Sequence, residues 1–200
     1  MPKDGTSREE ILQVATRILS SDGLSALSTR RLAAELDVST MVVYTRFGSM
    51  PELLAAMVDE GFQRLMERLG EVGQERDPIG QLLDLGDAYR ALVLSNPQLY
   101  AAMFGAVTDG NPKEEAERTK QGGSVLDVFA GAVARAIAEG SIGPGDPNAI
   151  AGQVWSAVHG CVMLELAGVL AHDRDVSAST SHPLLHTLIR GLGGSIDGRK

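Results

Sequence analysis

Two short apolar segments separated by a tight turn, near the start of the chain, restrict its fold most. They read TRRLAAEL after Ser28 and TMVVYTRF after Ser39, with Asp37 between them. Serine is a preferred helix N-cap, and apolar residues flank each serine with the spacing of a hydrophobic staple. A buried strand is the alternative for the second segment. Two capped helices around a turn fit better and predict a helix-turn-helix, whose second helix enters the DNA major groove.

Helical periodicity continues along the chain, and no stretch sustains the alternation of a half-buried strand. A T-x-x-E capping box, Thr6 with Glu9, predicts the start of the first helix. We expect an all-α fold of about nine helices. Three short helices lie in residues 1–50, a connecting helix covers 51–73, and a helical bundle occupies 74–200.

Within the bundle, Pro and Gly mark the expected boundaries. The pair Gly122 and Gly123 predicts an interruption of the helical stretch that runs to about residue 140. An apolar helix is expected over residues 147–171, and Pro183 predicts the start of a short last helix at 183–192.

The charge is unevenly distributed. The chain has 18 basic and 26 acidic side chains and a net charge of -8. Residues 1–50 contain six of each, so the whole net negative charge lies in residues 51–200. Because phosphate binding relies on Lys and Arg, an acidic chain is a poor general nucleic-acid binder, but the neutral first fifty residues leave DNA binding open there.

The compartment expected for the chain is the cytoplasm. Cys161 is the one cysteine in the sequence and cannot form an intrachain disulfide, which suits a reducing environment. The N-terminal residues lack the apolar core of a signal peptide. The longest apolar stretch contains His159 and Glu165 and is too short and polar for a convincing membrane span, so no membrane partner is expected.

Motifs in the first third of the chain carry a family resemblance. The segment RRLAAELDVSTMVVYTRFGSMPELLAAM contains an Ala-rich helix, a turn ending in Val-Ser, a Val-Tyr-x-x-Phe core and a Glu-Leu-Leu helix. In their order and spacing over residues 6–66, these motifs resemble the TetR (AcrR-like) family of bacterial transcriptional regulators. Two residues depart from the signature: Asp37 replaces a turn glycine, and Met50 replaces a frequent lysine that would contact phosphate.

The resemblance implies a set of DNA-facing residues. Thr29 and Tyr44 would bind backbone phosphates, Arg46 could contact phosphate or base, and Lys3 or Arg8 could reach flanking phosphates. The resemblance places Arg30, Thr40, Met41 and Thr45 nearest the base edges. It places Ser39 at the start of the reading helix, the second helix of the helix-turn-helix. Each of these residues could instead be an ordinary solvated side chain of a short helix.

The apolar helix at 147–171 must be buried on more than one side, in a bundle centre or against a second subunit. Its Trp155, His159-Gly160 and LELAG features resemble a recurrent TetR-family C-terminal domain known by its Trp-His-Gly pattern. The resemblance implies that residues 74–200 bind a small effector and that the helices at 147–171 and 183–192 form a homodimer.

An effector pocket needs an apolar lining and a few polar anchors. The candidate lining residues and anchors are Phe62, Met66, Tyr89, Tyr100, Phe104, Phe129, Trp155, His159 and Glu165. For each of them, an ordinary core position is the plainer interpretation. The low aromatic content suggests an effector that is mainly apolar or uncharged.

Two other classes of function compete with a regulator. His182 and His186 at i, i+4, or Cys161 near His172 and Asp173, could suggest a metal-dependent or Cys-His enzyme. No catalytic or metal motif supports this, so no catalytic residue, metal or cofactor is expected. A helical adaptor that binds protein and not DNA is the second alternative.

We therefore expect a ligand-responsive transcriptional regulator, most simply a repressor. It would bind a palindromic double-stranded operator as a homodimer and leave it when a small-molecule effector binds.

Overall fold

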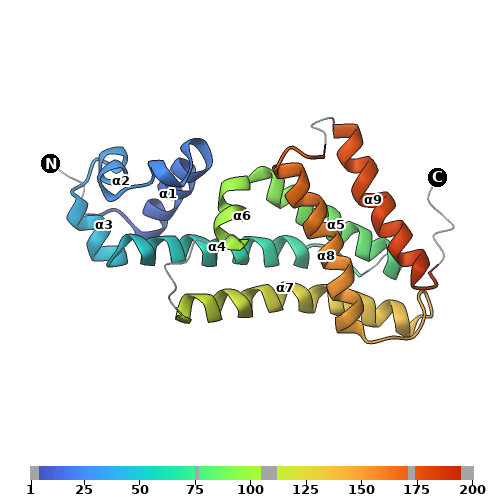
Figure 1. Ribbon diagram of the computed structural model, residues 1–200. Coiled ribbons are helices and arrows are strands. Elements are labelled where there is room, and N and C mark those ends of the chain that lie inside the picture. Colours follow the sequence, from blue (N-terminus) through green and yellow to red (C-terminus); the bar gives the residue numbers. More distant parts are fainter. Residues whose placement is uncertain (1–4, 75–76, 105–111, 171–173, 195–200) are drawn as a thin grey trace. The chain divides into compact units, whose positions relative to one another are not determined.

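The computed structural model describes residues 5–74, 77–104, 112–170 and 174–194 (Figure 1). These residues contain nine α-helices, one short 3-10 turn (η1, Leu24–Ala26) and no strand. The helices are α1 (Arg8–Asp22), α2 (Thr29–Leu36), α3 (Thr40–Phe47), α4 (Met50–Gly70), α5 (Pro78–Ser95), α6 (Pro97–Phe104), α7 (Pro112–Ala138), α8 (Pro147–Leu166) and α9 (Arg174–Gly191). Over the described ranges, the predicted all-α class and number of helices are confirmed.

The chain divides into two compact units. The N-terminal unit consists of Met1–Arg64 and Asn96–Glu115, and the C-terminal unit of Leu65–Ser95 and Ala116–Lys200. The long helix α4 therefore contributes residues to both units. Helix α6 belongs to the N-terminal unit, where it packs on α1.

The core of the N-terminal unit is built from one face of each short helix. Helix α1 buries Ile11, Leu12, Ala15, Ile18 and Leu19. Leu32 and Ala33 are the buried apolar residues of α2, and Val43 and Phe47 are those of α3. Leu36 is only half-buried, because it lies at the end of α2 next to the exposed turn.

The first helix begins one residue later than the sequence pattern predicted. Ser7, not Thr6, is the N-cap: its Oγ accepts a hydrogen bond from the Glu10 N–H (3.1 Å), and the Glu10 carboxylate accepts one from the Ser7 N–H (2.7 Å). Thr6 is instead buried, at 5% exposure. Either of the two adjacent hydroxyl residues could cap the helix. In the structure Ser7 is the cap, and Thr6 is buried.

Backbone geometry fixes the path between α2 and α3. Asp37 ends α2 in the left-handed conformation, with φ 54° and ψ 45°, which a short polar side chain tolerates. Gly48 ends α3 with φ 76°. Ser49 then caps α4 by accepting a hydrogen bond from the Glu52 N–H at 3.3 Å, as its S-x-x-E motif predicted.

The C-terminal unit is organised around α8, which packs on α5 and on α9. Gly86 of α5 lies where the three helices meet: a Cβ atom added there would be 3.1 Å from Leu185 Cδ1 and 3.4 Å from Val158 Cγ2. The absence of a side chain at Gly86 therefore lets α5 approach both partners closely.

Three predicted helix boundaries in this part of the chain are wrong. Helix α7 runs through Gly122 and Gly123 without interruption, and α8 ends at Leu166, before Gly168 with its φ of 69°. Helix α9 begins at Arg174 and includes Pro183 in its interior. Glycine and proline weaken a helix by about 1 and 3 kcal/mol, respectively, and packing of the flanking turns can outweigh such local penalties.

Helix α8 is also the one helix within the described ranges whose length and composition would allow it to cross a membrane, with a mean hydropathy of 1.2. The same criterion is met by core helices of bundles. About a third of this stretch is buried (33%), including Ile150, Val154 and Val158, and α8 packs on α5 and on α9.

Candidate nucleic-acid interface

Helix α3 has a buried side and an exposed side. Val43 and Phe47, four residues apart, are 3% and 7% exposed and fasten the helix to its unit. The exposed side chains are Thr40, Met41, Tyr44, Thr45 and Arg46. Met41 and Tyr44 are the largest apolar side chains among them, at 66% and 46% exposure. All of the predicted outward-facing residues of α3 are therefore exposed, with Thr40, Met41, Tyr44 and Thr45 on one side of the helix and Arg46 farther round it.

Two hydroxyl residues of α3 differ in their local bonds. Thr45 Oγ1 donates a hydrogen bond to the Met41 carbonyl oxygen at 2.7 Å, within the helix. Ser39 occupies the N-cap position with extended backbone, yet its side chain makes no capping hydrogen bond. Because Ser39 is exposed and not used as a cap, its hydroxyl faces solvent at the N-terminal end of α3.

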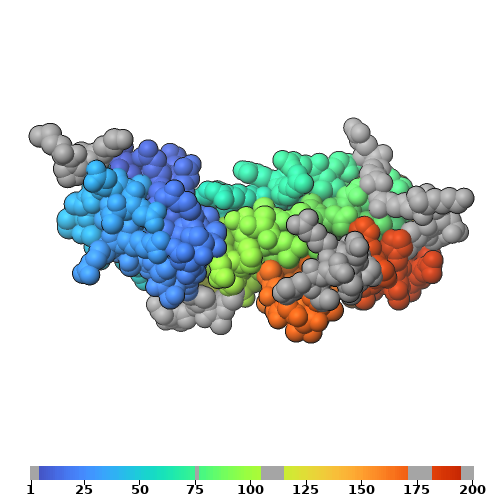
Figure 2. All heavy atoms as spheres, turned by 90° about the horizontal axis from the view of Figure 1, so that it is seen from above, coloured from blue at the N-terminus to red at the C-terminus, as the bar shows by residue number. Residues whose placement is uncertain are grey.

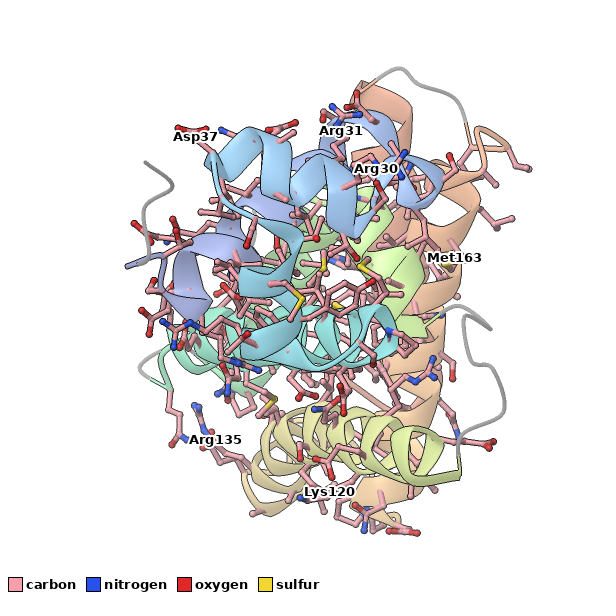
Figure 3. The ribbon with its side chains drawn as sticks, turned by 90° about the vertical axis from the view of Figure 1, so that its left-hand side faces the viewer. Arg30, Arg31, Asp37, Lys120, Arg135 and Met163 are labelled. Atoms are coloured by element: carbon pink, nitrogen blue, oxygen red, sulfur yellow. The ribbon has the colours of Figure 1, made fainter. Side chains whose placement is uncertain are left out.

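Two adjacent arginines of α2 have different surroundings (Figure 3). Arg31 binds Asp22 of α1 (2.5 Å) and Glu35 of its own helix (3.2 Å), and Arg17 of α1 also binds Glu35 (2.8 Å). The hydrogen bonds to Glu35 and Asp22 raise the pKa of Arg31 above its ordinary value. Arg31 thus fastens α2 to α1, whereas the exposed Arg30 was the one predicted to meet DNA.

The remaining predicted DNA residues occupy the edges of the same unit. Thr29 is the first residue of α2 and is only 9% exposed, so little of it is accessible to a phosphate. The Arg8 guanidinium lies over the Phe47 ring, 4.8 Å from its centroid, and so reaches the end of α3 from the start of α1. Lys3 lies outside the described residues.

The nine effector-site candidates fall in two units. In the N-terminal unit, the Phe104 ring lies edge-on to Phe62 (centroids 5.3 Å apart) and 4.8 Å from Tyr100. Met66, Tyr89, Phe129, Trp155, His159 and Glu165 belong to the C-terminal unit.

Inside the C-terminal unit, polar contacts join α5 to α8. Tyr89 Oη lies 3.0 Å from His159 Nδ1, and burial lowers the pKa of His159. The next residue, Arg90, donates from Nε to both carboxylate oxygens of Glu165 at 3.0 Å. Phe129 is fully buried and Met66 half-buried, and the Trp155 ring lies edge-on to His159.

Arg90 is the residue that the sequence interpretation missed. Glu165 was considered as an anchor for an effector, but its side chain is 6% exposed and already bound by Arg90. A buried carboxylate requires a charged or hydrogen-bonding partner. From the sequence, this requirement could have predicted that a basic side chain of another helix faces Glu165 on α8.

No group of three or more His, Cys, Asp or Glu side chains within the described ranges is placed to hold a metal ion. His182 instead binds Asp87 of α5 at 2.7 Å, and the rings of His182 and His186 stack with centroids 6.4 Å apart. Burial raises the pKa of the Cys161 thiol, an effect strengthened by the Glu165 charge. His172 and Asp173 lie outside the described residues.

Two family models match this chain. The model for bacterial regulatory proteins of the tetR family matches residues 11–57. The model for the tetracyclin repressor-like C-terminal domain matches residues 82–187, more than half of the chain. The chain belongs to the TetR family.

Relatives and solved structures are similar to this chain over most of its length. The uncharacterized HTH-type transcriptional regulator Rv0681 of Mycobacterium tuberculosis is 29% identical over 167 residues, 82% of this chain and 72% of the relative. A solved structure of a protein with unknown function from Rhodococcus sp. RHA1 is 29% identical, with a TM-score of 0.82 over 96% of this chain and 98% of the other. AibR in complex with isovaleryl coenzyme A and operator DNA is 19% identical, with a TM-score of 0.69 over 90% of this chain and 97% of its own.

The TetR assignment confirms the family predicted from the residues and the function of a DNA-binding transcriptional regulator. TetR-family proteins are regulators and not enzymes, which argues against the enzymatic alternative. The first model covers α2 and α3, so the exposed side of α3 belongs to the part of the chain that defines a TetR-family DNA-binding domain.

Proposed function

We propose that this TetR-family protein is a homodimeric repressor that binds a palindromic operator and is released by a small-molecule effector. The observation that carries the proposal is the exposed side of α3, which is held in place by buried Val43 and Phe47. A helix anchored on one side and polar or accessible on the other can enter the major groove as a rigid body.

The roles proposed for individual residues follow their positions. Thr40, Met41 and Thr45 of α3 and Arg30 of α2 would lie nearest base edges, and Ser39 at the N-terminal end of α3. Tyr44 and Arg46 would bind phosphates, with Arg46 also able to reach a base, and Thr29 would contribute only the small part of its side chain that is accessible. Arg8 and Lys3 would contact flanking phosphates. Neutralising phosphates releases counterions, so binding should weaken as salt rises.

The domain roles proposed for the chain are those of the sequence interpretation. Residues 1–50 would read DNA, the helix within 51–73 would connect, and residues 74–200 would bind the effector and dimerise. The described α4 occupies Met50–Gly70 of that connection.

A second copy of the chain would pack against α8 and α9. Large apolar side chains stay exposed on both helices: Met163 and Leu164 on α8 at 44% and 45%, and Leu184 on α9 at 41%. Figure 2 shows part of the surface of α8 in orange and of the C-terminal half of α9 in red. To meet successive major grooves, a two-fold dimer needs its two α3 helices about 34–36 Å apart.

The effector proposed is mainly apolar or uncharged. Glu165 is already neutralised by Arg90, so its carboxylate is not available to anchor a cationic ligand unless that pair opens. AibR, a protein of this fold, binds isovaleryl coenzyme A and operator DNA, which supports a small-molecule effector; the phosphates of that ligand are charged, so the polarity proposed here rests on this chain's own residues. Release requires the effector to favour the non-binding conformation, with a coupling free energy of about 1–3 kcal/mol.

A cytoplasmic location and the absence of catalysis belong to the same proposal, because a regulator acts where the chromosome is. Turnover of a substrate by the purified protein, or stoichiometric metal in it, would contradict that part of the proposal.

The test is binding of the purified full-length protein to fragments of its own upstream DNA, at two salt concentrations and against random competitor. The expected result is competitor-resistant binding of two protomers per site that weakens with salt. Tyr44→Ala and Arg46→Ala should each reduce binding severalfold. Lys120→Ala on α7 removes the same charge as Arg46→Ala from an exposed position, at 76% side-chain exposure, and is the matched control.

A protein that prefers no upstream fragment has its operator elsewhere in the genome or a reading helix disabled by a change such as Met50, and binding that is unaffected by the α3 substitutions would favour the protein-binding adaptor.

A further inference from the structure

Met41 is the most exposed large apolar side chain of the reading helix. It is the second residue of α3, and two thirds of its surface (66%) is accessible. The core on this helix is already provided by Val43 and Phe47. The apolar side chain of Met41 is therefore not needed for the core of the N-terminal unit.

The neighbouring Thr45 makes the local surface less able to donate hydrogen bonds. Its hydroxyl proton is used in the 2.7 Å bond to the Met41 carbonyl oxygen, so it is not available to a base acceptor such as guanine O6 or N7. Met41 and Thr45 are one helical turn apart and lie on the same side of α3. Together they form a surface where an apolar side chain is prominent and the hydroxyl donor of Thr45 is occupied.

The major groove offers one apolar group that such a surface can recognise, the C5-methyl of thymine. We propose that Met41 is a specificity-determining residue that contacts a thymine C5-methyl in each operator half-site. The inference rests on the proposed function, because it requires that α3 enter the major groove. It adds the chemical group on DNA that this position reads.

The side chain suits that role for physical reasons. Methionine is unbranched, and its polarizable thioether adapts to the shape of a partner. Burying one methyl-sized group contributes enough to change a binding constant about fourfold. A cytosine at the same position offers an amino group and no methyl, so both the missing contact and the buried polar group disfavour it.

The test begins with an operator selected by the full-length protein from randomised, unmodified duplex DNA. Each thymine of the selected site is then replaced by deoxyuridine, which removes only the methyl group. For the natural protein, one position in each half-site should lose about fourfold in affinity on this change. Met41→Ala should bind the parent operator more weakly and should no longer distinguish thymine from deoxyuridine at that position.

Two further variants keep the result interpretable. Met41→Leu retains an apolar side chain and should keep the sensitivity to the methyl group. Met41→Gln has nearly the same length but a polar end and should lose it. Circular dichroism and thermal unfolding identify any variant that fails to fold, and a weak Met41→Ala can be replaced in the comparison by Met41→Gln.

The C5-methyl is also present on 5-methylcytosine, so a second selection uses a library with every cytosine methylated. A methyl requirement that appears only in this library would overturn thymine as the proposed source. An operator that tolerates deoxyuridine at every position, or a loss that is equal in the natural protein and Met41→Ala, would overturn the role of Met41. A failure to enrich any duplex would overturn the proposed function itself.

Discussion

The guanidinium of Arg8, at the start of α1, lies 4.8 Å from the ring centroid of Phe47, at the end of α3. This contact joins two residues that are 39 positions apart in the chain, at the edge of the exposed side of α3. Phe47 is buried and Arg8 exposed, so the pair connects the core of the N-terminal unit to its solvent-facing side.

Replacing Arg8 by Ala should lower both stability and DNA affinity. An exposed cation–π contact contributes about 0.5–1 kcal/mol, so chemical denaturation should show a loss of that size. If Arg8 also binds a phosphate, the slope of log affinity against log salt should decrease by about one. Arg8→Lys keeps the charge but not the planar stacking. It should restore the salt slope more than the stability, and an unchanged salt slope in Arg8→Ala would remove Arg8 from the phosphate contacts.

Removing Arg90 should destabilise the C-terminal unit strongly. Arg90→Ala would leave the Glu165 carboxylate buried without its guanidinium partner, a situation that costs about 3 kcal/mol. Chemical denaturation measures the loss. Arg68→Ala is the matched control, since Arg68 forms an exposed ion pair with Glu71, and it should cost less than about 1 kcal/mol. Equal losses in the two variants would show that burial of the Arg90–Glu165 pair is unimportant.

Acidification should weaken the fold through His159. Burial lowers its pKa in the folded protein below the ordinary value of 6.5, so the unfolded chain binds a proton at higher pH than the folded chain does. Stability contributed by neutral His159 is therefore present above pH 6.5 and decreases as pH falls from there toward the lower folded-state pKa. The free energy of unfolding, measured from pH 7.5 to 5, should fall more for the natural protein than for His159→Gln.

Tyr89→Phe provides the control for that series. It removes the hydroxyl that lies 3.0 Å from His159 Nδ1 but keeps the buried imidazole. Its pH dependence should therefore persist, at lower overall stability. A pH dependence that vanished in Tyr89→Phe would assign the effect to the hydrogen bond instead of to desolvation.

The proposed dimer surface can be tested by introducing one charged side chain into it. Leu164→Asp would place a carboxylate on the exposed apolar side of α8 and should produce monomers in size-exclusion chromatography with light scattering. Leu24→Asp in η1, at a site with 36% exposure, is the comparison and should stay dimeric. A dimeric Leu164→Asp would place the interface elsewhere on the chain.

Local signals in the sequence predicted the helix-turn-helix, α2 and α3, well. The N-cap residue Ser28 and the left-handed tolerance of Asp37 act within a few residues, so the sequence was sufficient to place α2, the turn and α3. The same holds for the buried pair Val43 and Phe47. The sequence alone could not show whether Thr6 or Ser7 caps α1, because the answer depends on which hydroxyl residue the rest of the unit buries.

Long-range packing explains what the sequence interpretation could not supply. Pro183 and the pair Gly122 and Gly123 are poor helix residues by local propensity, yet they lie inside continuous helices. The Arg90–Glu165 pair joins residues 75 positions apart, and spacing along one helix contains no information about such a partner. The aromatic candidates for the effector site likewise come from helices far apart in the sequence, and their role in ligand binding stays a prediction.

The close approach at Gly86 has an evolutionary consequence. A methyl group at this position would need the Leu185 side chain to shift by a few tenths of an ångström, because it would lie 3.1 Å from Cδ1. Related chains with a larger residue at position 86 should therefore compensate with a smaller one at position 185. The two sites are expected to change as a pair, so that the combined side-chain volume at this helix junction varies less than either volume alone.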